Sequence, residues 1–485
     1  MTGSRAPATP WLALSEVLRA VQGTARAGAL GKTEPSFTGC SIDSRTVADG
    51  EIFVPLPGSR ADGHAFVAAA LAAGAAASFV ARGKELGPEA TLAGKTLIEV
   101  NDPLEALQVL GRHCRERSGV ETVGVTGSNG KTTTKEMIAA VLGTSRRVHK
   151  NVGNLNNHIG VPLTLTKLTP AHDALVMEMG MSARGEIRFL ASLARPGVGV
   201  LTNAGAAHLL QLGSVEEVAL AKSELAEAIP PDGLLVLNAD DPLLWPLNRN
   251  RPVTVRSYAL QNPEADLRPL DVVVTPSGGT RFTLADGTTV NLSLLGTHNV
   301  RNALAAILVG DRFGVPRAES ARALEALRPA RRRLELHTSS AGVSVLDDAY
   351  NANPASMREA LSLLGSMEAR GARRAVLGDM LELGPDSERL HEEAGRGVPA
   401  DAWLYVAGDF APAVERGARA AGVPASRIRR FDDVDAMARA VAKDADPGDL
   451  VLVKASRGMR LERVVEAIVP GPAVGSASPE RAGRR

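Results

Sequence analysis

Short apolar runs alternate with amphipathic stretches through the middle of the chain. Apolar runs that end in Gly, Asn or Asp occupy residues 121–127, 172–180, 197–205 and 233–240. Helix-period patterns lie between them, most clearly at 131–143 and 215–229. This alternation favours a parallel β-sheet with helices on both faces.

A second series of the same kind begins after Pro329. Its apolar runs occupy residues 342–350, 373–380, 401–409 and 448–456, without a glycine-rich phosphate loop. The first 115 residues are rich in Ala and Gly and contain shorter apolar runs at 51–56 and 77–81. We therefore predict an α/β protein of three domains: a small α/β domain at 1–115, a central parallel-sheet domain at 116–328 and a Rossmann-like α/β domain at 329–470. Residues 471–485 are predicted to be a disordered tail.

Composition agrees with three domains and excludes several classes of partner. The chain has 485 residues, which suggests three domains at about 150 residues each. Its 55 basic and 54 acidic residues nearly cancel, so no overall field attracts nucleic acid or an anionic membrane. The chain has two cysteines, Cys40 and Cys114, and they form no C-x-x-C pair. This spacing argues against a zinc ribbon and against a disulfide framework.

The sequence also gives expectations about location. No apolar run approaches the length of a membrane span, and the first residues lack the apolar segment and cleavage site of a signal peptide. We expect a cytoplasmic monomer that acts on small molecules.

The stretch GVTGSNGKTTTKE at 124–136 predicts a phosphate-binding loop. An apolar strand precedes it and a good helix-forming segment follows it, as such a loop requires. Lys131 would reach the outer phosphates and Thr132 would bind Mg²⁺. Val125 stands where the usual motif has its first glycine, which argues against the common kinase and GTPase classes. The alternative is a glycine turn before an ordinary helix.

One lysine lies on a face that should be apolar. Residues 215–229 form an amphipathic pattern, and Ser214 with Glu217 makes an S-x-x-E capping box at its start. Lys222 falls on the same stripe as Val218 and Leu225. A buried lysine must find a partner or lose its charge, so the alternatives are an ion pair, snorkelling to solvent, or a special chemical role.

Two further residues favour the special role. Glu178 ends one predicted strand and His208 follows the next, so both would lie near the phosphate loop at the carboxyl ends of parallel strands. Together with Lys222 they suggest a second metal site. A neutral lysine amine reacts with carbon dioxide to give a carbamate, which is an oxygen ligand for a hard cation.

At this point the sequence resembles the Mur ligases, which add amino acids to the peptide of bacterial cell-wall precursors. The loop TGSNGKTTT is common to that superfamily and to the folylpolyglutamate synthases. More specific are GNLNNHIGVPLTL, MEMGMSARGEI, TNAGAAHL and AKSEL, then DDAYNANPASM and LGDMLELG in the last domain. The resemblance runs from about Trp11 to Val465, with mild departures at Ser223 and Ala455, where glycine is usual.

The last-domain motifs resemble the branch of the family that attaches D-alanyl-D-alanine. The resemblance implies that ATP phosphorylates the carboxylate of UDP-N-acetylmuramoyl-tripeptide, and that the amine of D-alanyl-D-alanine attacks the acyl phosphate. It also implies two Mg²⁺ ions, with Thr132 and Glu178 as metal ligands. His208 would be a ligand of the second ion, and Lys222 would be carbamylated. The catalytic set that we predict consists of Lys131, Glu178, His208 and Lys222.

The resemblance also assigns binding residues, for which ordinary structural roles are the alternatives. Asn299 could instead cap a helix, Arg333 could be solvated, and Asp348, Tyr350 and the DSR and DGH stretches could be simple turns. The ATP set is Gly127, Ser128, Asn129, Gly130, Lys131, Thr132, Thr133, Asn299, Asn302, Arg333 and Asp348. The UDP set is Ser44, Arg45, Asp62, Gly63 and His64. The set at the dipeptide is Tyr350, Asn351, Lys454 and Arg457.

Other functions fit the sequence less well. Folylpolyglutamate synthases normally lack the first domain and the YNANP segment. The branch of the Mur ligases that adds the third amino acid carries a different recognition segment in its last domain, which this sequence does not contain. A non-catalytic nucleotide switch would not need Lys131, Glu178, His208 and Lys222 together. A nucleic-acid-dependent ATPase is disfavoured by the near-zero charge and 3% aromatic content. The sequence leaves open whether the third peptide residue is diaminopimelate or lysine.

Overall fold

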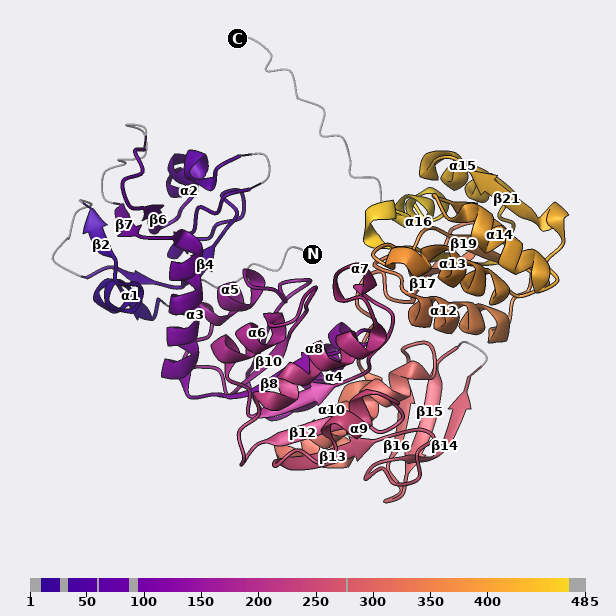
Figure 1. Ribbon diagram of the computed structural model, residues 1–485, viewed down its shortest axis with the longest axis horizontal. Helices are drawn as coiled ribbons and strands as arrows, with labels where there is room; N and C mark the ends of the chain where they lie inside the picture. Colours follow the sequence, from indigo (N-terminus) through magenta and orange to yellow (C-terminus); the bar gives the residue numbers. More distant parts are fainter. Residues whose placement is uncertain (1–9, 27–33, 59–60, 87–94, 276–277, 471–485) are drawn as a thin grey trace, which may run out of the picture.

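The computed structural model describes residues 10–26, 34–58, 61–86, 95–275 and 278–470. In it the chain forms three α/β bodies, with the first and last domains flanking the central one (Figure 1). The predicted α/β fold class is confirmed. The predicted disordered tail at 471–485 lies outside the described residues. Within the described part of the chain, no helix is both long and apolar enough to cross a membrane.

The central domain is built on a six-stranded sheet whose strands are all parallel. The order from edge to edge is β13 (Thr254–Tyr258), β12 (Leu234–Asn238), β11 (Val198–Leu201), β8 (Glu121–Thr126), β10 (Ala174–Glu178) and β9 (Val148–Lys150). β8 lies inside the sheet: the next two strands along the chain, β9 and β10, lie on one side of it, and β11, β12 and β13 lie on the other. The carboxyl end of β8 is therefore the switch point at which open α/β sheets bind ligands.

Helices cover both faces of this sheet, which explains why the inner strands β10, β11 and β12 are buried and mostly apolar along their whole length. One face packs against α4 (Lys131–Leu142), α10 (His298–Arg312) and α11 (Arg317–Glu325). The other packs against α5 (Gly160–Leu165), α6 (Glu186–Ala194), α8 (Val215–Glu227) and α9 (Leu244–Asn248). Consecutive residues of β10 and β12 point to opposite clusters, as the strand period of two requires.

The central domain also contains a small antiparallel sheet that the sequence analysis did not predict. It consists of β14 (Pro269–Val274), β15 (Thr280–Leu284) and β16 (Thr289–Leu292). The tight turn between β15 and β16 contains Asp286 and Gly287, and Gly287 has φ of 86°. An Asp-Gly pair between alternating apolar residues is a strong hairpin signal, and it was overlooked.

The first domain has a five-stranded sheet in the order β2 (Thr24–Arg26), β7 (Thr96–Val100), β6 (Ala77–Ala81), β5 (Glu51–Phe53) and β4 (Gly39–Ser41). A short pair, β1 (Leu12–Ala13) and β3 (Ser36–Phe37), completes the strands. Its helices are α1 (Leu14–Val21), α2 (Val67–Ala72) and the 3₁₀ turn η1 (Gly63–Phe66). All neighbours in the main sheet are parallel except β2 and β7.

A single helix, α3 (Pro103–Ser118), leads from the first domain into the central one. The predicted boundary at 115 falls in the last turns of this helix. Gln108 donates to the carbonyl of His158 at 3.1 Å, and the Arg115 guanidinium donates to the carbonyl of Ala194 at 2.9 Å. Lys167 and Glu51 add an ion pair of 2.6 Å. The junction is therefore held by a continuous helix and by contacts on both sides of it.

The last domain is a second sheet, in the order β17 (Glu335–Thr338), β18 (Ser344–Asp348), β22 (Leu450–Lys454), β19 (Arg373–Leu377), β20 (Trp403–Ala407) and β21 (Ile428–Phe431). Only β17 is antiparallel to its neighbour. The sequence analysis took the apolar run at 342–350, with Asp348, as the first strand of this domain. Because β17 comes first, Asp348 ends the second strand, which corrects that expectation.

Helices again lie on both faces of the last sheet. One cluster contains α12 (Pro354–Ser366), α13 (Ser387–Arg396) and α14 (Ala411–Ala420). The other contains α15 (Val434–Asp444) and α16 (Glu462–Ile468). Short 3₁₀ turns complete the domain: η3 (Gly384–Asp386), η4 (Ala425–Arg427) and η5 (Arg457–Met459).

The junction between the central and last domains is an irregular segment. Arg332 and Leu334 both have left-handed backbone conformations, with φ of 62° and 50°. Non-glycine residues adopt this region at a cost, so the surrounding contacts must hold them there.

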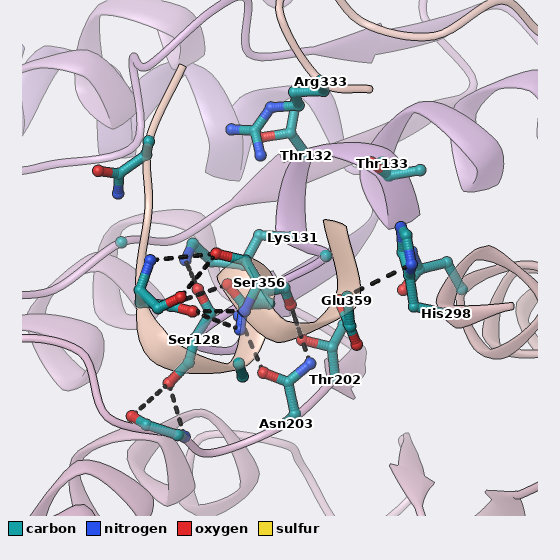
Figure 2. A pocket seen from close by; sticks show the side chains of 18 of the residues that line it. Ser128, Lys131, Thr132, Thr133, Thr202, Asn203, His298, Arg333, Ser356 and Glu359 are labelled. Carbon is teal, nitrogen blue, oxygen red and sulfur yellow. Dashed lines mark hydrogen bonds and ion pairs between the residues drawn. The ribbon is translucent and has the colours of Figure 1, made fainter. Parts of the chain in front are cut away.

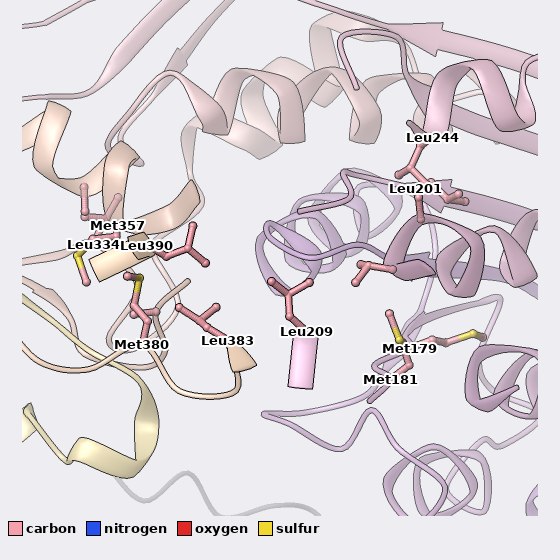
Figure 3. Packing of buried hydrophobic residues seen from close by; sticks show 14 of the residues in the cluster. Met179, Met181, Leu201, Leu209, Leu244, Leu334, Met357, Met380, Leu383 and Leu390 are labelled. Carbon is pink, nitrogen blue, oxygen red and sulfur yellow. The ribbon is translucent and has the colours of Figure 1, made fainter. Parts of the chain in front are cut away.

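A second contact between these domains comes from α7 (Leu209–Leu212). Leu209 lies beside the last domain near Leu383, apart from the central-domain residues Met179 and Leu201 (Figure 3). The amide of Leu210 donates to the Glu382 carbonyl at 3.1 Å.

Candidate active site

A cleft of about 670 Å³ lies between the central and last domains. The carboxyl ends of β8, β10, β11 and β12 face it from one domain, and those of β18 and β22 face it from the other. The cleft therefore combines two sheet ends at which α/β proteins bind ligands.

The phosphate loop follows β8 as predicted, and α4 begins at Lys131. Gly127 has φ of 155°, and a Cβ added there would lie 1.8 Å from Thr202 Oγ1. Gly130 has φ of 78°, and its added Cβ would lie 2.7 Å from Asn302 Oδ1. Both glycines are therefore required by close contacts, which an ordinary turn would not impose.

The loop is fixed from outside by the end of β11 (Figure 2). The Asn129 amide donates to Asn203 Oδ1 at 2.8 Å, and the Asn129 carbonyl accepts from Thr202 Oγ1 at 2.6 Å. The Ser128 amide donates to the Asn203 carbonyl at 2.9 Å. Thr202 and Asn203 were not singled out individually, although they lie within the TNAGAAHL motif.

The Lys131 amine is folded back onto its own loop. It donates to the carbonyl of Gly127 at 2.6 Å and to that of Ser128 at 3.2 Å. Burial lowers the pKa of Lys131, while Glu178 raises it and Arg333 lowers it. The amine thus lies at the centre of the loop, where a bound anion would favour its charged form.

Glu178 ends β10 and is 2% exposed. Its Oε2 accepts from Thr132 Oγ1 at 2.8 Å, and its Oε1 accepts from Asn156 Nδ2 at 2.8 Å. The buried Lys135 amine lies 3.9 Å from Oε2. The structure therefore joins the predicted pair Thr132 and Glu178, and adds Asn156 and Lys135, which the sequence analysis did not name.

Lys222 lies on the buried face of α8, which confirms the periodicity argument, and is 2% exposed. Ser214 caps the helix by accepting from the Glu217 amide, but Glu217 bonds to Arg184 rather than back to Ser214. Within the described part of the chain, the Lys222 amine has no carboxylate at ion-pair distance. Burial lowers its pKa well below the usual value, and Lys131 lowers it further. No ion pair therefore holds the Lys222 amine among the described residues, and the low exposure of the side chain disfavours snorkelling past the helix.

His208 lines the cleft, but its ring is engaged by the last domain. Its Nδ1 lies 2.7 Å from Glu382 Oε2. Both residues have left-handed backbones, with φ of 57° and 65°. Burial lowers the pKa of His208, while Glu382 raises it. A histidine whose Nδ1 donates to a carboxylate presents Nε2 as its acceptor atom, as metal-binding histidines do.

The predicted nucleotide residues Asn299 and Asn302 lie on α10 and are both 5% exposed. Asn299 Nδ2 donates to the Leu295 carbonyl at 2.8 Å, and Asn302 Nδ2 donates to Asn299 Oδ1 at 3.0 Å. Asn302 Oδ1 also accepts from Thr134 Oγ1 at 3.1 Å. Asn299 therefore does not cap the helix, because its amide bonds to a preceding carbonyl.

Charged and aromatic side chains of the last domain close the other side of the cleft. The Arg333 guanidinium lies 4.3 Å from the centre of the Tyr350 ring, and that of Arg457 lies 5.7 Å from it. Lys454 Nζ contacts Asp348 Oδ2 at 2.5 Å and donates to the Asn351 carbonyl at 3.0 Å. Both bonds hold the segment that follows β18 against β22.

The predicted UDP residues Ser44, Arg45, Asp62, Gly63 and His64 lie in the first domain and do not line this cleft. Several of them bond to one another or to near neighbours. Asp62 lies 2.7 Å from both His64 Nδ1 and Lys84 Nζ, while His64 Nε2 accepts from the Ala81 amide at 3.1 Å. Arg45 pairs with Asp43. In the structure, the side chains of the DSR stretch (43–45) and the DGH stretch (62–64) are therefore engaged in local contacts, as the turn interpretation expects.

The side chains at the loop fit a divalent cation. Thr132 and Glu178 supply adjacent oxygens. Among the described residues, neither His208 Nε2 nor the Lys222 amine has a hydrogen-bond partner. Another group of possible ligands lies on β17 and β18, consisting of Glu335, His337 and Asp347. That group does not line the cleft.

Comparison with protein families matches each domain of the chain in turn. Residues 36–115 match the Mur ligase family, catalytic domain; residues 125–310 match the Mur ligase middle domain; and residues 332–457 match the Mur ligase, glutamate ligase domain.

Curated relatives match over nearly the whole chain. A protein of Bacillus subtilis named UDP-N-acetylmuramoyl-tripeptide--D-alanyl-D-alanine ligase is 40% identical over 442 residues, covering 90% of this chain and 93% of the relative. A protein of the same name from Escherichia coli is 35% identical over 450 residues, covering 91% and 96%.

Solved structures show the same arrangement of domains. MurF from Acinetobacter baumannii superimposes with a TM-score of 0.82 at 29% identity, covering 96% of this chain and 99% of that one. MurF ligase from Thermotoga maritima in complex with ADP gives 0.75 at 30% identity, covering 89% and 97%. On these matches and on the cleft described above, the chain belongs to the Mur ligase family.

Proposed function

We propose that this chain is the ligase that joins D-alanyl-D-alanine to UDP-N-acetylmuramoyl-tripeptide at the expense of ATP. The observation that carries the proposal is the shared cleft, in which the phosphate loop faces Asp348, Tyr350 and Asn351 of the last domain. The names of the relatives supply the substrates.

The reaction has two steps. The terminal carboxylate of the tripeptide takes the γ-phosphoryl group of ATP, which releases ADP and gives an acyl phosphate. The amine of the dipeptide then attacks the acyl carbon, the amide bond forms, and inorganic phosphate leaves with the bonding electron pair while the amine loses a proton. A carboxylate alone is a poor acyl donor, so phosphorylation supplies the leaving group.

Lys131 has the central role in the first step. Its amine must exchange the Gly127 and Ser128 carbonyls for phosphate oxygens, and there it stabilises the charge on the transferring group. The backbone amides of 127–133 and the start of α4 bind the other phosphate oxygens. Asn299, Asn302, Arg333 and Asp348 complete our proposed nucleotide site.

Thr132 and Glu178 would hold one magnesium ion, and His208 with Lys222 would hold a second. Bound magnesium would supply charge neutralisation for the phosphates during transfer. We propose that Lys222 carries a carbamate, formed when its uncharged amine takes up carbon dioxide and loses a proton. Its burial beside Lys131 supports this, since both features disfavour an ammonium.

We assign the remaining substrate groups to the other domains. UDP would bind the first domain (1–115) at Ser44, Arg45, Asp62, Gly63 and His64. The dipeptide would bind the last domain (329–470) at Tyr350, Asn351, Lys454 and Arg457. ATP would then bind the central domain (116–328). We also propose that the enzyme is a monomer that works in the cytoplasm, where ATP and UDP-linked metabolites are found.

The test is phosphate release measured with each UDP-N-acetylmuramoyl-peptide, with and without D-alanyl-D-alanine. We expect ATP-dependent turnover only with the tripeptide and the dipeptide together. Robust turnover with UDP-N-acetylmuramoyl-dipeptide and a single amino acid would reject this function. Parallel assays with diaminopimelate and lysine tripeptides would identify the third residue.

A further inference from the structure

Two asparagine side chains join the phosphate loop to the last domain. Asn353 Nδ2 donates to Asn129 Oδ1 at 2.7 Å, and Asn129 Nδ2 donates to Asn353 Oδ1 at 3.2 Å. The residues are 224 positions apart, and both line the cleft. Such a reciprocal pair satisfies both amides and fixes their relative orientation.

On the central-domain side, the loop does not need the Asn129 side chain for its own shape. The backbone of Asn129 is already fixed in both directions by Asn203 and Thr202. The described contacts of its side-chain amide are those to Asn353. The side chain is therefore free to act as a fixed contact point for the other domain.

On the other side, Asn353 performs two tasks at once. It is the N-cap of α12, where its Oδ1 accepts from the Ser356 amide at 2.9 Å. Serine and aspartate cap helices about as well as asparagine. Among these three, the amide alone can accept from both Ser356 and Asn129 while donating to Asn129 Oδ1. Helix capping therefore explains a polar residue at 353, and the bond to the loop explains why it is asparagine.

The pair fixes one end of the segment that carries the last domain's cleft residues. Lys454 holds the start of this segment through Asp348 and the Asn351 carbonyl. Asn353 holds its end to the phosphate loop, five residues after Asp348. Six residues further along the chain, in α12, Glu359 lies 3.7 Å from His298 of α10, a longer second contact between the same two domains (Figure 2).

We propose that Asn353 is a positioning residue, which acts through Asn129 to set Tyr350 and Asn351 at a fixed distance from the phosphate loop. The pair would align the attacking dipeptide with the acyl phosphate rather than bind ATP. The kinetic consequence rests on the proposed function, whereas the bridge between the two elements does not.

The test uses Asn353→Ser, Asn129→Ser and the double variant in the full chain. Serine keeps the α12 cap, is uncharged, and is too short to bridge the domains. Asp433→Ser is the matched control, because Asp433 caps α15 of the same domain through the Ala436 amide and lies outside the cleft. For every variant, kcat for ligation, the melting temperature and amide hydrogen exchange of 127–133 and 349–360 are measured. ATP affinity is measured for Asn353→Ser.

We expect kcat of Asn353→Ser to fall about tenfold, as loss of a pair of positioning hydrogen bonds predicts. Its ATP affinity should change less than about twofold. The double variant should be no slower than the slower single variant, because each residue acts through the other. Hydrogen exchange of both segments should increase without substrates, while Asp433→Ser should match the wild type in kcat and exchange.

Additive losses in the double variant, or an unchanged kcat for Asn353→Ser, would overturn the positioning role. Unchanged hydrogen exchange in both segments would overturn the bridge itself. If the wild-type enzyme did not ligate the proposed substrates, the proposed function would fall, and the exchange comparison would still decide whether the pair joins the domains.

Discussion

At the residue scale, the central feature is a lysine on a buried helix face whose amine has no bonded partner in the part of the chain that the structure describes. Lys222 lies near Lys131, and two amines that both remained charged would repel each other in a site shielded from water. A carbamate would reverse the sign of one of them. The site would then hold one cation from the loop and one anion from α8.

We predict that Lys222→Ala is nearly inactive and is partly rescued by short carboxylic acids. The carboxylate of such an acid would fill the space left by the carbamate and supply the same oxygens. The measurement is ligase turnover with added acetate or formate, with Lys443→Ala, an exposed lysine of α15 outside the cleft, as the control. An unmodified Lys222 ammonium in a structure with Mg²⁺, an ATP analogue and bicarbonate would contradict the prediction.

We predict that Lys131→Ala lowers kcat at least about a hundredfold and leaves the fold intact, because it removes the charge that stabilises phosphoryl transfer. Circular dichroism and the melting temperature should match the wild type, since the bonds of the amine to described residues go to carbonyls of its own loop. Wild-type turnover at saturating ATP would show that another residue supplies this charge.

How much of the site could be predicted depends on whether its signals are local. Periodicity located Lys222 on a buried face, and the order of strand, glycine loop and helix located Lys131. Glu382 and Asn353 could not be found in this way, because their partners His208 and Asn129 lie in another domain. A cap residue such as Asn353 has the same local pattern whether or not it also bonds to a distant loop.

At the scale of elements, strand and helix periods predicted the two large sheets well. The failure lay in the small sheet of β14, β15 and β16, where the Asp286–Gly287 turn was a usable signal. β17 was missed for another reason, because its exposed residues, Leu336 and Thr338, alternate with the half-buried polar residues Glu335 and His337. An edge strand of this kind has no apolar face to reveal it.

Helix α3 offers a test of the first domain junction. Gly111 is buried, and a Cβ added there would lie 2.8 Å from the Pro162 carbonyl oxygen, which belongs to a backbone that cannot easily shift. We predict that Gly111→Ala lowers the free energy of unfolding by about 1–3 kcal/mol, although alanine favours helix more than glycine.

The matched control is Gly365→Ala in α12. Its added Cβ would meet Pro399 at 3.4 Å, an ordinary contact, so no loss of stability is expected. Thermal unfolding of both variants makes the comparison, and equal melting temperatures would show that α3 and α5 are not packed tightly at Gly111.

At the scale of the whole molecule, the two domain junctions differ in kind. The first is a helix with hydrogen bonds along it, and the second is a segment with two left-handed residues, Arg332 and Leu334. Closure over substrates is therefore expected from the last domain.

We predict that small-angle scattering gives a smaller radius of gyration with an ATP analogue and UDP-N-acetylmuramoyl-tripeptide than without ligands. Identical profiles would argue against a large closure.

The firm attachment of the first domain through α3 has a consequence for the choice of substrate. If UDP binds there, the span from its binding site to the phosphate loop is set by the protein and does not change as the last domain moves. That span acts as a ruler for the peptide, because only a chain of the right length can bring its terminal carboxylate to ATP. Selection between two and three residues would then be a matter of reach, decided before any side chain of the peptide is recognised.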